Sequence, residues 1–252
     1  MLVSDPLFYA AAIPAVLLFG ISKGGFGGGL GVLAVPLVAL VVSPVQAAAI
    51  LLPVLCCLDV IGLWAYWGKW DVPNLRILIP ASIVGIVAGT LLFRYLSPAV
   101  IKLLLGIISI LFSMDYWIRA AHTSADGRSR PAVLGGGLAG ALGGFTSFIA
   151  HSGGPPINMY LLPQRMHRTL FVGTTVLLFT VINYAKLIPY TWLGLLHGNN
   201  LLTSLVLLPA AVAGFFTGIW LHRNVPEKIF YRVCYLFLFI VGDQTGTGRL
   251  RV

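Results

Sequence analysis

Residues 23–29 read KGGFGGG and residues 151–156 read HSGGPP, and each run interrupts a long stretch that has almost no charge. Lys23 is the only charged residue in the stretch 6–42, and the stretch 131–164 contains no Asp, Glu, Lys or Arg. Each stretch is too long for one membrane crossing. Backbone can leave helical geometry at membrane depth only where protein or a water-filled cavity satisfies its polar groups. We therefore expect both stretches to be re-entrant or broken helical hairpins.

The composition of the chain excludes an ordinary soluble enzyme. Of its 252 residues 58% are hydrophobic and 9% are charged, whereas soluble domains carry about 25% charged residues. Lys and Arg exceed Asp and Glu by 16 to 7, and they lie mainly in short segments between apolar runs. This pattern indicates membrane orientation rather than nucleic-acid binding. We therefore expect the lipid bilayer as the environment and no nucleic acid as a partner. The three cysteines have no metal-ligand spacing, so we expect no metal and no cofactor.

Further apolar runs approach or exceed the length of about 20 residues that a helix needs to cross a bilayer. Together with the two hairpins they predict an all-α polytopic membrane protein. The predicted spans are 45–67, 77–96, 99–118, 167–190, 201–221 and a shorter 227–242.

The sequence also contains an internal duplication. Most of its matching positions are 129 residues apart, and two further matches have slightly smaller offsets: Gly28 corresponds to Gly153, and Asp59 corresponds to Asn183. We expect a single membrane domain, 1–252, of two repeats that each consist of a hairpin and three transmembrane helices. The repeats are 6–118 and 131–242, joined by a cytoplasmic loop 119–130 and followed by a polar tail 243–252. The main matches are Pro80, Gly85, Gly89 and Arg94, which recur 129 positions later as Pro209, Gly214, Gly218 and Arg223.

Loop charge predicts that the two repeats are inverted. The link 43–46 is uncharged, but its counterpart 163–168 is basic; the link 68–76 contains Lys69 and Arg76, but its counterpart 191–200 contains neither Lys nor Arg. Equivalent loops therefore face opposite sides of the membrane. With the loop 119–130 in the cytoplasm, most basic residues are inside and both termini are outside.

The two breaks are the expected anion site. Helical runs follow them at Leu30–Val42 and Pro155–Leu162, and two helix N-termini that meet would favour negative charge. Ser152 is the expected N-cap of the second run, and Pro155 suits its first turn. The glycines of Gly85-xxx-Gly89 and Gly214-xxx-Gly218 are instead expected to allow close helix packing. The candidate substrate-binding residues at the breaks are Lys23, Gly27, Gly28, Gly29, His151, Ser152, Gly153, Gly154 and Pro155.

Polar residues inside the spans are further candidates, because a charge in the bilayer is costly. Asn183 and Lys186 share a helix face, with Thr174 and Thr175 earlier on the same helix. Lys186 either faces the site or snorkels to the membrane surface. Asp59 could accept a proton, pair with Lys186 or Lys23, or bond a neighbouring helix.

His151 is the other candidate for proton coupling beside Asp59. A histidine titrates near neutrality, so at the second break it could gate or couple protons. The alternative is a neutral histidine that is bonded to a carbonyl.

Three segments carry a family resemblance: GISKGGFGGGLGVLAVPLVAL, FTSFIAHSGGPPINMYLLPQRM and FVGTTVLLFTVINYAKLIPYTWLGLL. They are similar to the signature segments of the sulfite exporter TauE/SafE family, also called the toluene-sulfonate uptake permease family, over residues 8 to about 240. The resemblance implies a bacterial inner-membrane transporter of sulfite, sulfonates or related small organic anions. The matching motif residues are Gly27 to Gly29, His151 to Pro155, Thr174, Asn183 and Lys186. The chain departs from the family at 242–244, where it turns polar and shortens the last helix.

The first hypothesis is therefore a secondary transporter of a small sulfur-containing anion. Export is preferred, because an interior-negative potential favours anion efflux by about 2.3 kcal/mol per charge per 100 mV. A passive anion channel and a non-transporting membrane scaffold are the alternatives. No catalytic constellation is visible, so we do not expect an enzyme. A homo-oligomer is compatible with each hypothesis.

Overall fold

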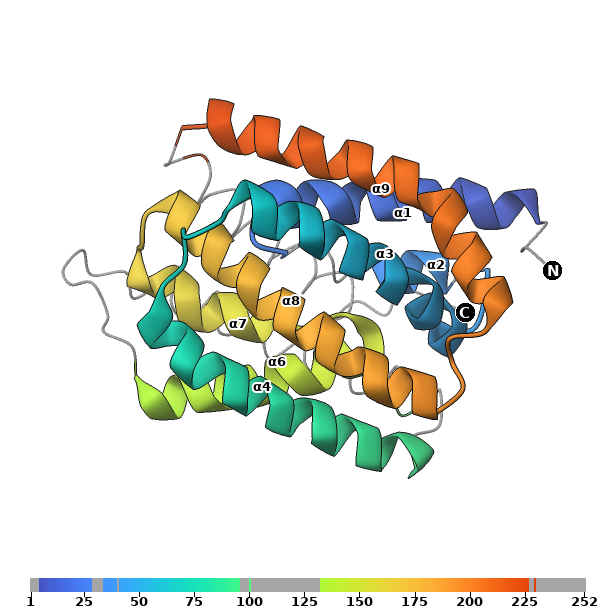
Figure 1. Cartoon of the computed structure of the whole chain (residues 1–252), viewed down its shortest axis with the longest axis horizontal. Coiled ribbons are helices and arrows are strands. Elements are labelled where there is room, and N and C mark those ends of the chain that lie inside the picture. The colour runs from blue at the N-terminus through green and yellow to red at the C-terminus, as the bar shows by residue number, and fades with distance from the viewer. Residues whose placement is uncertain are drawn as a thin grey trace.

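The computed structural model describes residues 5–28, 34–39, 41–95 and 132–226, together with the single residues 100 and 229. All secondary structure in these residues is helical, and the long helices lie side by side in one bundle (Figure 1). In chain order the elements are α1 (Pro6–Gly25), α2 (Ala34–Val38), α3 (Pro44–Ala65), α4 (Val72–Leu92), the 3-10 turn η2 (Phe93–Tyr95), α6 (Val133–Ala150), α7 (Gly154–Leu161), the 3-10 turn η3 (Leu162–Gln164), α8 (Arg168–Trp192) and α9 (Gly198–Asn224).

Three of the long helices start at a polar cap that is followed within two residues by proline. A cap oxygen replaces the missing partner of a first-turn N–H group, and proline has no N–H group to leave unpaired. The side chains of Asp5, Ser43 and Asp71 cap α1, α3 and α4, and they accept hydrogen bonds from the N–H groups of Leu7, Gln46 and Asn74 at 2.9, 3.2 and 2.9 Å.

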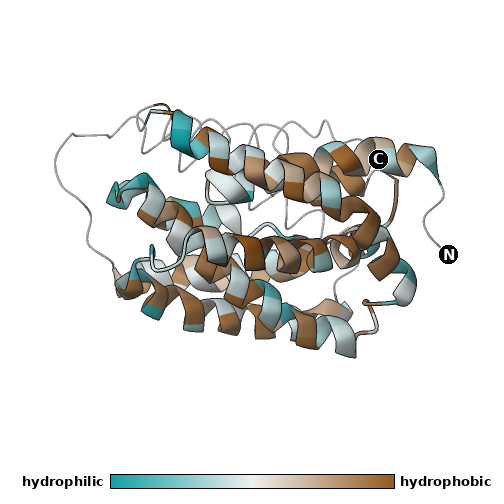
Figure 2. Cartoon of the chain, turned by 45° about the horizontal axis from the view of Figure 1, so that its top comes forward, coloured by the Kyte–Doolittle hydropathy of each residue, from teal (hydrophilic) through white to brown (hydrophobic). Residues whose placement is uncertain are grey.

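Six of the described helices are long and apolar enough to cross a membrane: α1, α3, α4, α6, α8 and α9. Large apolar side chains on their outer faces are exposed, among them Trp64, Leu134, Ile188 and Trp220. Figure 2 shows that hydrophilic residues concentrate near the helix ends. An apolar waist with polar ends is the surface that a bilayer requires, so the chain is a multi-pass membrane protein.

Four of the predicted spans are confirmed, with shifted ends. The spans 45–67, 77–96, 167–190 and 201–221 correspond to α3, α4, α8 and α9. The spans 99–118 and 227–242, the loop 119–130 and the polar tail 243–252 lie outside the described residues, apart from the isolated residues 100 and 229.

The two limbs of each hairpin differ in length, because the first limb is a full-length helix and the second is short. α1 has 20 residues and α6 has 18, but α2 has 5 and α7 has 8. The expected helical run Leu30–Val42 is wrong at its end, where the chain turns at Ala39 and again at 41–42. In Figure 1, α1 and α3 both begin near the N-terminal end of the bundle, whereas α6 and α8 both begin at the other end. Each hairpin therefore brings the chain back to the end at which it entered.

Two glycine-lined seams join the hairpin helices to the rest of the bundle. α1 packs along α9, and α6 packs along α4. A Cβ atom on Gly214 would overlap the carbonyl oxygen of Leu17, and one on Gly85 would overlap that of Ala141. These glycines therefore serve close helix packing, as the sequence indicated. In the reverse direction, Gly20 meets the Ala211 carbonyl, and Gly144 meets the Ser82 carbonyl.

The packing at Gly144 can be tested against Gly137 on the same helix. A Cβ atom on Gly144 would collide with the backbone of α4, whereas one on Gly137 would have no neighbouring atom within 4 Å. We expect Gly144→Ala to lower the stability of the detergent-solubilised protein by about 1–3 kcal/mol through overpacking. Gly137→Ala should leave it unchanged or raise it by up to about 1 kcal/mol through helix propensity. Thermal unfolding of the two variants measures this difference, and equal shifts would contradict the seam.

The middle of the bundle is the antiparallel pair α3 and α8. Gly62 lies against Val176, and Asp59 bonds Thr180 further along α8, so the two helices run in opposite directions. The two helices place their polar side chains deep inside the bundle, where Asp59 is fully buried.

Basic residues gather at one end of the bundle. This is the end at which α4 and α8 begin and α9 ends (Figure 1). The guanidinium of Arg168 donates a hydrogen bond to the carbonyl of Val225, which ties the start of α8 to the end of α9. Arg94, in η2, belongs to the opposite end. The basic residues at the first end are Lys69, Arg76, Arg165, Arg168 and Arg223.

Candidate functional site

The two chain breaks meet at one pocket, as the sequence predicted. It has an empty volume of about 310 Å³, including the space at its open side. Residues of both hairpins line it, and α3 and α8 supply the rest. We call it the central pocket. Its lining residues are Phe19, Lys23, Gly28, Leu55, Ser147, His151, Gly154, Phe179 and Asn183.

The first break needs glycine for two reasons. Gly27 and Gly28 have φ angles of 67° and 81°, in the left-handed region that glycine adopts without steric cost. A Cβ atom on Gly27 would also lie 2.5 Å from the ring of Phe171. Gly29, a predicted site residue, lies outside the described residues.

The second break is built on a strained histidine. His151 follows α6 with φ 52° and ψ 26°, a conformation that a non-glycine residue adopts only at an energetic cost. Such strain is found mostly at functional sites. The expected cap by Ser152 is wrong: the N-cap of α7 is Gly153, and the Ser152 hydroxyl donates to the carbonyl of Ala150 at 3.1 Å.

The N-terminus of α7 offers fewer donors than expected. Pro155 lies in its first turn, as predicted, but Pro156 follows it. Neither residue has an N–H group, so two positions of the first turn cannot bind an anion. Side-chain donors must therefore supply most of any anion recognition here.

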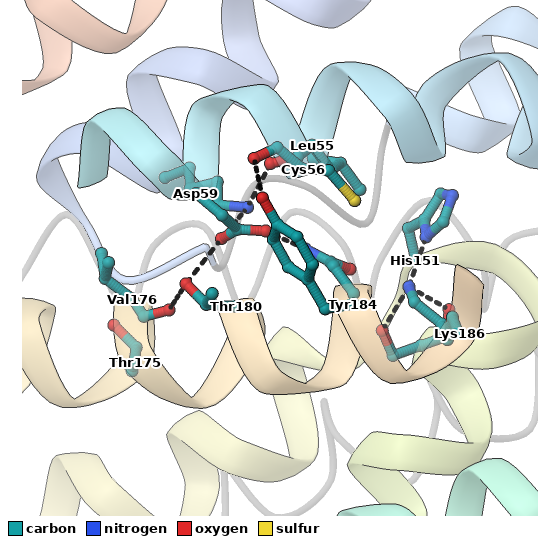
Figure 3. A network of polar contacts seen from close by, with 12 residues as sticks. Leu55, Cys56, Asp59, His151, Thr175, Val176, Thr180, Tyr184 and Lys186 are labelled. Carbon is teal, nitrogen blue, oxygen red and sulfur yellow. Dashed lines mark hydrogen bonds and ion pairs between the residues drawn. The ribbon is translucent and has the colours of Figure 1, made fainter. Parts of the chain in front are cut away.

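Asp59 forms a buried ion pair with Lys23. The Lys23 Nζ lies 2.6 Å from Asp59 Oδ1, and the two side chains are 4% and 0% exposed. The Asn183 amide donates to Asp59 Oδ2 at 2.8 Å, and the Thr180 hydroxyl donates to Oδ1 at 3.2 Å (Figure 3). Of the alternatives for Asp59, the structure shows two together: the pair with Lys23 and the bonds to a neighbouring helix, α8. Its role in proton coupling stays a prediction.

Lys186 is held by a second polar cluster. Its ammonium donates to the carbonyl and the hydroxyl oxygen of Ser147 at 3.1 and 3.0 Å, and it contacts His151 Nδ1 at 2.8 Å (Figure 3). The side chain is fully buried, so the snorkelling alternative is wrong. All three N–H groups of the ammonium are used, and an anion that binds Lys186 must replace one of these partners.

The contacts of His151 assign its protonation. Its Nε2 lies 2.9 Å from the carbonyl oxygen of Ala48, so Nε2 carries a proton and donates. Its Nδ1 then accepts from Lys186, which makes the ring a neutral imidazole. The ring also stacks on Tyr190, with the centroids 6.3 Å apart. The structure thus shows the alternative of a histidine bonded to a carbonyl, and proton coupling through it is untested.

With Lys186 in its ammonium form, the charges around the central pocket add up to +1 among the described residues. Lys23 and Asp59 cancel, whereas Lys186 contacts only the neutral groups of Ser147 and His151. Within the described ranges, the pair of Lys23 and Asp59 is the one ion pair. Burying a charge without a counter-charge is unfavourable, so this site gains stability from a negatively charged ligand.

Of the two predicted threonines, one lies at the first break and the other lies away from the central pocket. Thr175 lies beside the first break, 3.0 Å from the position of a Cβ atom on Gly27. Thr174 lies at the basic end of the bundle and accepts from the Asp71 N–H group at 2.8 Å, away from the central pocket.

Several residues of the site were not anticipated from the sequence. Ser147 holds Lys186, and the Phe179 ring lies against both breaks, 3.4 Å and 3.1 Å from Cβ positions on Gly28 and Gly153. The hydroxyls of Tyr66 and Tyr190 donate to carbonyls at the ends of α1 and α6. The duplication contained a signal for them: the offset of 124 that relates Asp59 to Asn183 also relates Tyr66 to Tyr190, and Lys23 to Ser147.

Comparison with known families places the chain. The family model for the sulfite exporter TauE/SafE matches residues 12–244, which includes both breaks and every described helix except the start of α1. The chain belongs to the TauE/SafE family. Neither the curated proteins nor the solved structures gave a match to it. TauE/SafE is a family of membrane transporters, in agreement with the six apolar helices of this chain.

Proposed function

We propose that this TauE/SafE protein is a secondary transporter that exports a small sulfur-containing anion, such as sulfite or a sulfonate, across the bacterial inner membrane. The observation that carries the proposal is the central pocket, where both chain breaks meet beside the buried Lys186, whose charge has no counter-charge among the described residues. The family description supplies the substrate class.

We propose Lys186 and Lys23 as the charged ligands of the anion, with Asn183, Ser147 and His151 beside them. The backbone at Gly27 to Gly29 and at Ser152 to Pro155 would shape the site, and Thr175 would support the first break. A sulfur oxyanion has several oxygens, and it can accept bonds from several donors at once. Thr174 is the weakest member of this proposed set, because its hydroxyl is used at the basic end of the bundle.

We propose that two inverted repeats move against each other during transport. Matched contacts support the arrangement: Tyr66 bonds the Gly24 carbonyl at 2.6 Å, and Tyr190 bonds the Phe148 carbonyl at 2.7 Å. Both residues of the second bond lie 124 positions after those of the first. The glycine seams also match: Gly20 and Gly144 are 124 positions apart, and Gly85 and Gly214 are 129 positions apart. α3 and its counterpart α8 run antiparallel. Rocking of one repeat against the other would expose the site alternately to the two sides.

The basic end of the bundle is the proposed cytoplasmic end. Short loops that contain Lys and Arg remain in the cytoplasm, and this end carries Lys69, Arg165 and Arg168. The same orientation puts Asp5 outside. An interior-negative potential then drives an anion from the basic end outward, which supports export.

Flux measurements in proteoliposomes test the proposal. We expect saturable flux of labelled sulfite or methanesulfonate, and acceleration of uptake by unlabelled substrate inside the vesicles. Protein-free vesicles serve as the control, since neutral sulfur dioxide crosses lipid unaided. Flux that does not saturate and shows no counter-flow would favour a channel. The absence of flux above the control for every sulfur anion would reject transport.

A further inference from the structure

The central pocket, together with the side chains that contact its lining, carries one net positive charge when Lys186 is an ammonium. Lys23 of α1 lines the pocket. Asp59 of α3 and Lys186 of α8 lie behind the lining, where Asp59 contacts Lys23, and Lys186 contacts Ser147 and His151. The other titratable groups nearby are His151 after α6, Cys56 on α3, and Tyr184 and Tyr190 on α8. His151 is a neutral imidazole, and the two tyrosine hydroxyls keep their protons, which they donate to carbonyls. Cys56 is a free, buried cysteine.

The two cations differ in how much charge they leave for a ligand. Lys23 is neutralised by Asp59 at 2.6 Å and also donates to the Leu55 carbonyl at 3.3 Å. Asp59 is itself fixed by Asn183 and Thr180. Lys186 therefore provides the one positive charge that a ligand can neutralise. A second negative charge on the ligand would have no partner among the described residues.

Desolvation in the pocket also makes the binding of a second negative charge unfavourable. Phe19, Leu55 and Phe179 form an apolar part of its lining, next to the polar groups. The cost of moving an ion out of water rises with the square of its charge, whereas its attraction to a single cation rises only in proportion to the charge. A monoanion is therefore favoured over a dianion of similar size.

We propose that the central pocket selects the charge of its substrate, taking anions of charge −1 and rejecting anions of charge −2. This inference rests on the proposed function and narrows its substrate class. Sulfite changes between hydrogensulfite and the sulfite dianion near neutral pH, so the transported species would be hydrogensulfite. A small alkyl sulfonate has one charge throughout this range, and sulfate has two.

The test compares methanesulfonate, sulfite and sulfate in proteoliposomes of the intact chain, at several pH values from mildly acid to mildly alkaline. Methanesulfonate is the matched control, because its charge is constant and any pH effect on its flux reports the protein. We expect the flux of sulfite, divided by that of methanesulfonate, to fall as the pH rises, in proportion to the hydrogensulfite fraction. Sulfate should compete with methanesulfonate at least about tenfold more weakly than hydrogensulfite does.

A variant provides a second measurement. Asp59→Asn removes the negative charge that neutralises Lys23 of the pocket lining, so the ratio of sulfate binding to methanesulfonate binding should rise in any folded fraction isolated by size exclusion. A sulfite-to-methanesulfonate ratio that stays constant or rises with pH would overturn the inference while leaving transport intact. Sulfate that competes as well as methanesulfonate would do the same. If none of these anions moves faster than in protein-free vesicles, the proposed function fails and the inference falls with it.

Discussion

Lys186→Gln should weaken the apparent affinity for sulfite or methanesulfonate by about 10- to 100-fold. A hydrogen bond to a charged group contributes about 1.5–3 kcal/mol, and each 1.4 kcal/mol corresponds to a factor of ten. Lys186 is fully buried, contacts the pocket-lining residues Ser147 and His151, and has no acidic partner among the described residues. The variant should fold as well as the parent, since it removes a buried charge. Flux against substrate concentration in proteoliposomes gives the apparent affinity.

Lys69→Gln is the matched control for Lys186→Gln. Lys69 is an exposed cation at the basic end of the bundle, remote from the central pocket. It has the same change of charge, so any general effect of net charge on anion flux appears in both variants. We expect less than about a twofold change for Lys69→Gln, as for an exposed charge. Equal affinities in Lys186→Gln and the parent would remove Lys186 from the site.

Asp59→Asn should cost about 3–5 kcal/mol of stability. The substitution leaves Lys23, which is 4% exposed, as a buried cation that has lost its counter-charge. The double variant Lys23→Gln with Asp59→Asn removes both charges and should recover most of the loss. Thermal unfolding of the parent, both single variants and the double variant forms a complete cycle.

Asp71→Asn controls for the chemistry of the substitution. Asp71 caps α4, and asparagine caps helices as well as aspartate does, so the stability should change little. If the double variant were as unstable as Asp59→Asn alone, the stabilising role assigned to the ion pair would be wrong.

The sequence predicted the elements whose signals are local. Apolar runs of membrane length located α3, α4, α8 and α9, and the runs KGGFGGG and HSGGPP located the two breaks. The cost of a buried charge singled out Lys23, Asp59 and Lys186 before their partners were known. Residues with unusual energetic cost inside an apolar chain can thus be recognised without a structure.

The pairing of these residues could not be predicted, because it depends on distances between helices. Asp59 had two candidate cations, Lys23 and Lys186, and the choice of Lys23 follows from the packing of α1 beside α3. The cap at Ser152 was wrong because the left-handed turn at His151 moves the start of α7 by one residue, to follow Gly153. Ser147 was missed because a serine on a helix gives no signal of its own.

Each glycine seam joins a helix of the first half of the chain to a helix of the second half, and this has a consequence for synthesis. α1 is the first described helix to leave the ribosome, yet its glycine seam closes on α9, the last one. The glycine seam of the newly inserted α1 must therefore stay open in the membrane until more than 170 further residues have been made. A chain released early would present that unpaired seam, which makes α1 the segment by which a quality-control protease could recognise an unfinished molecule.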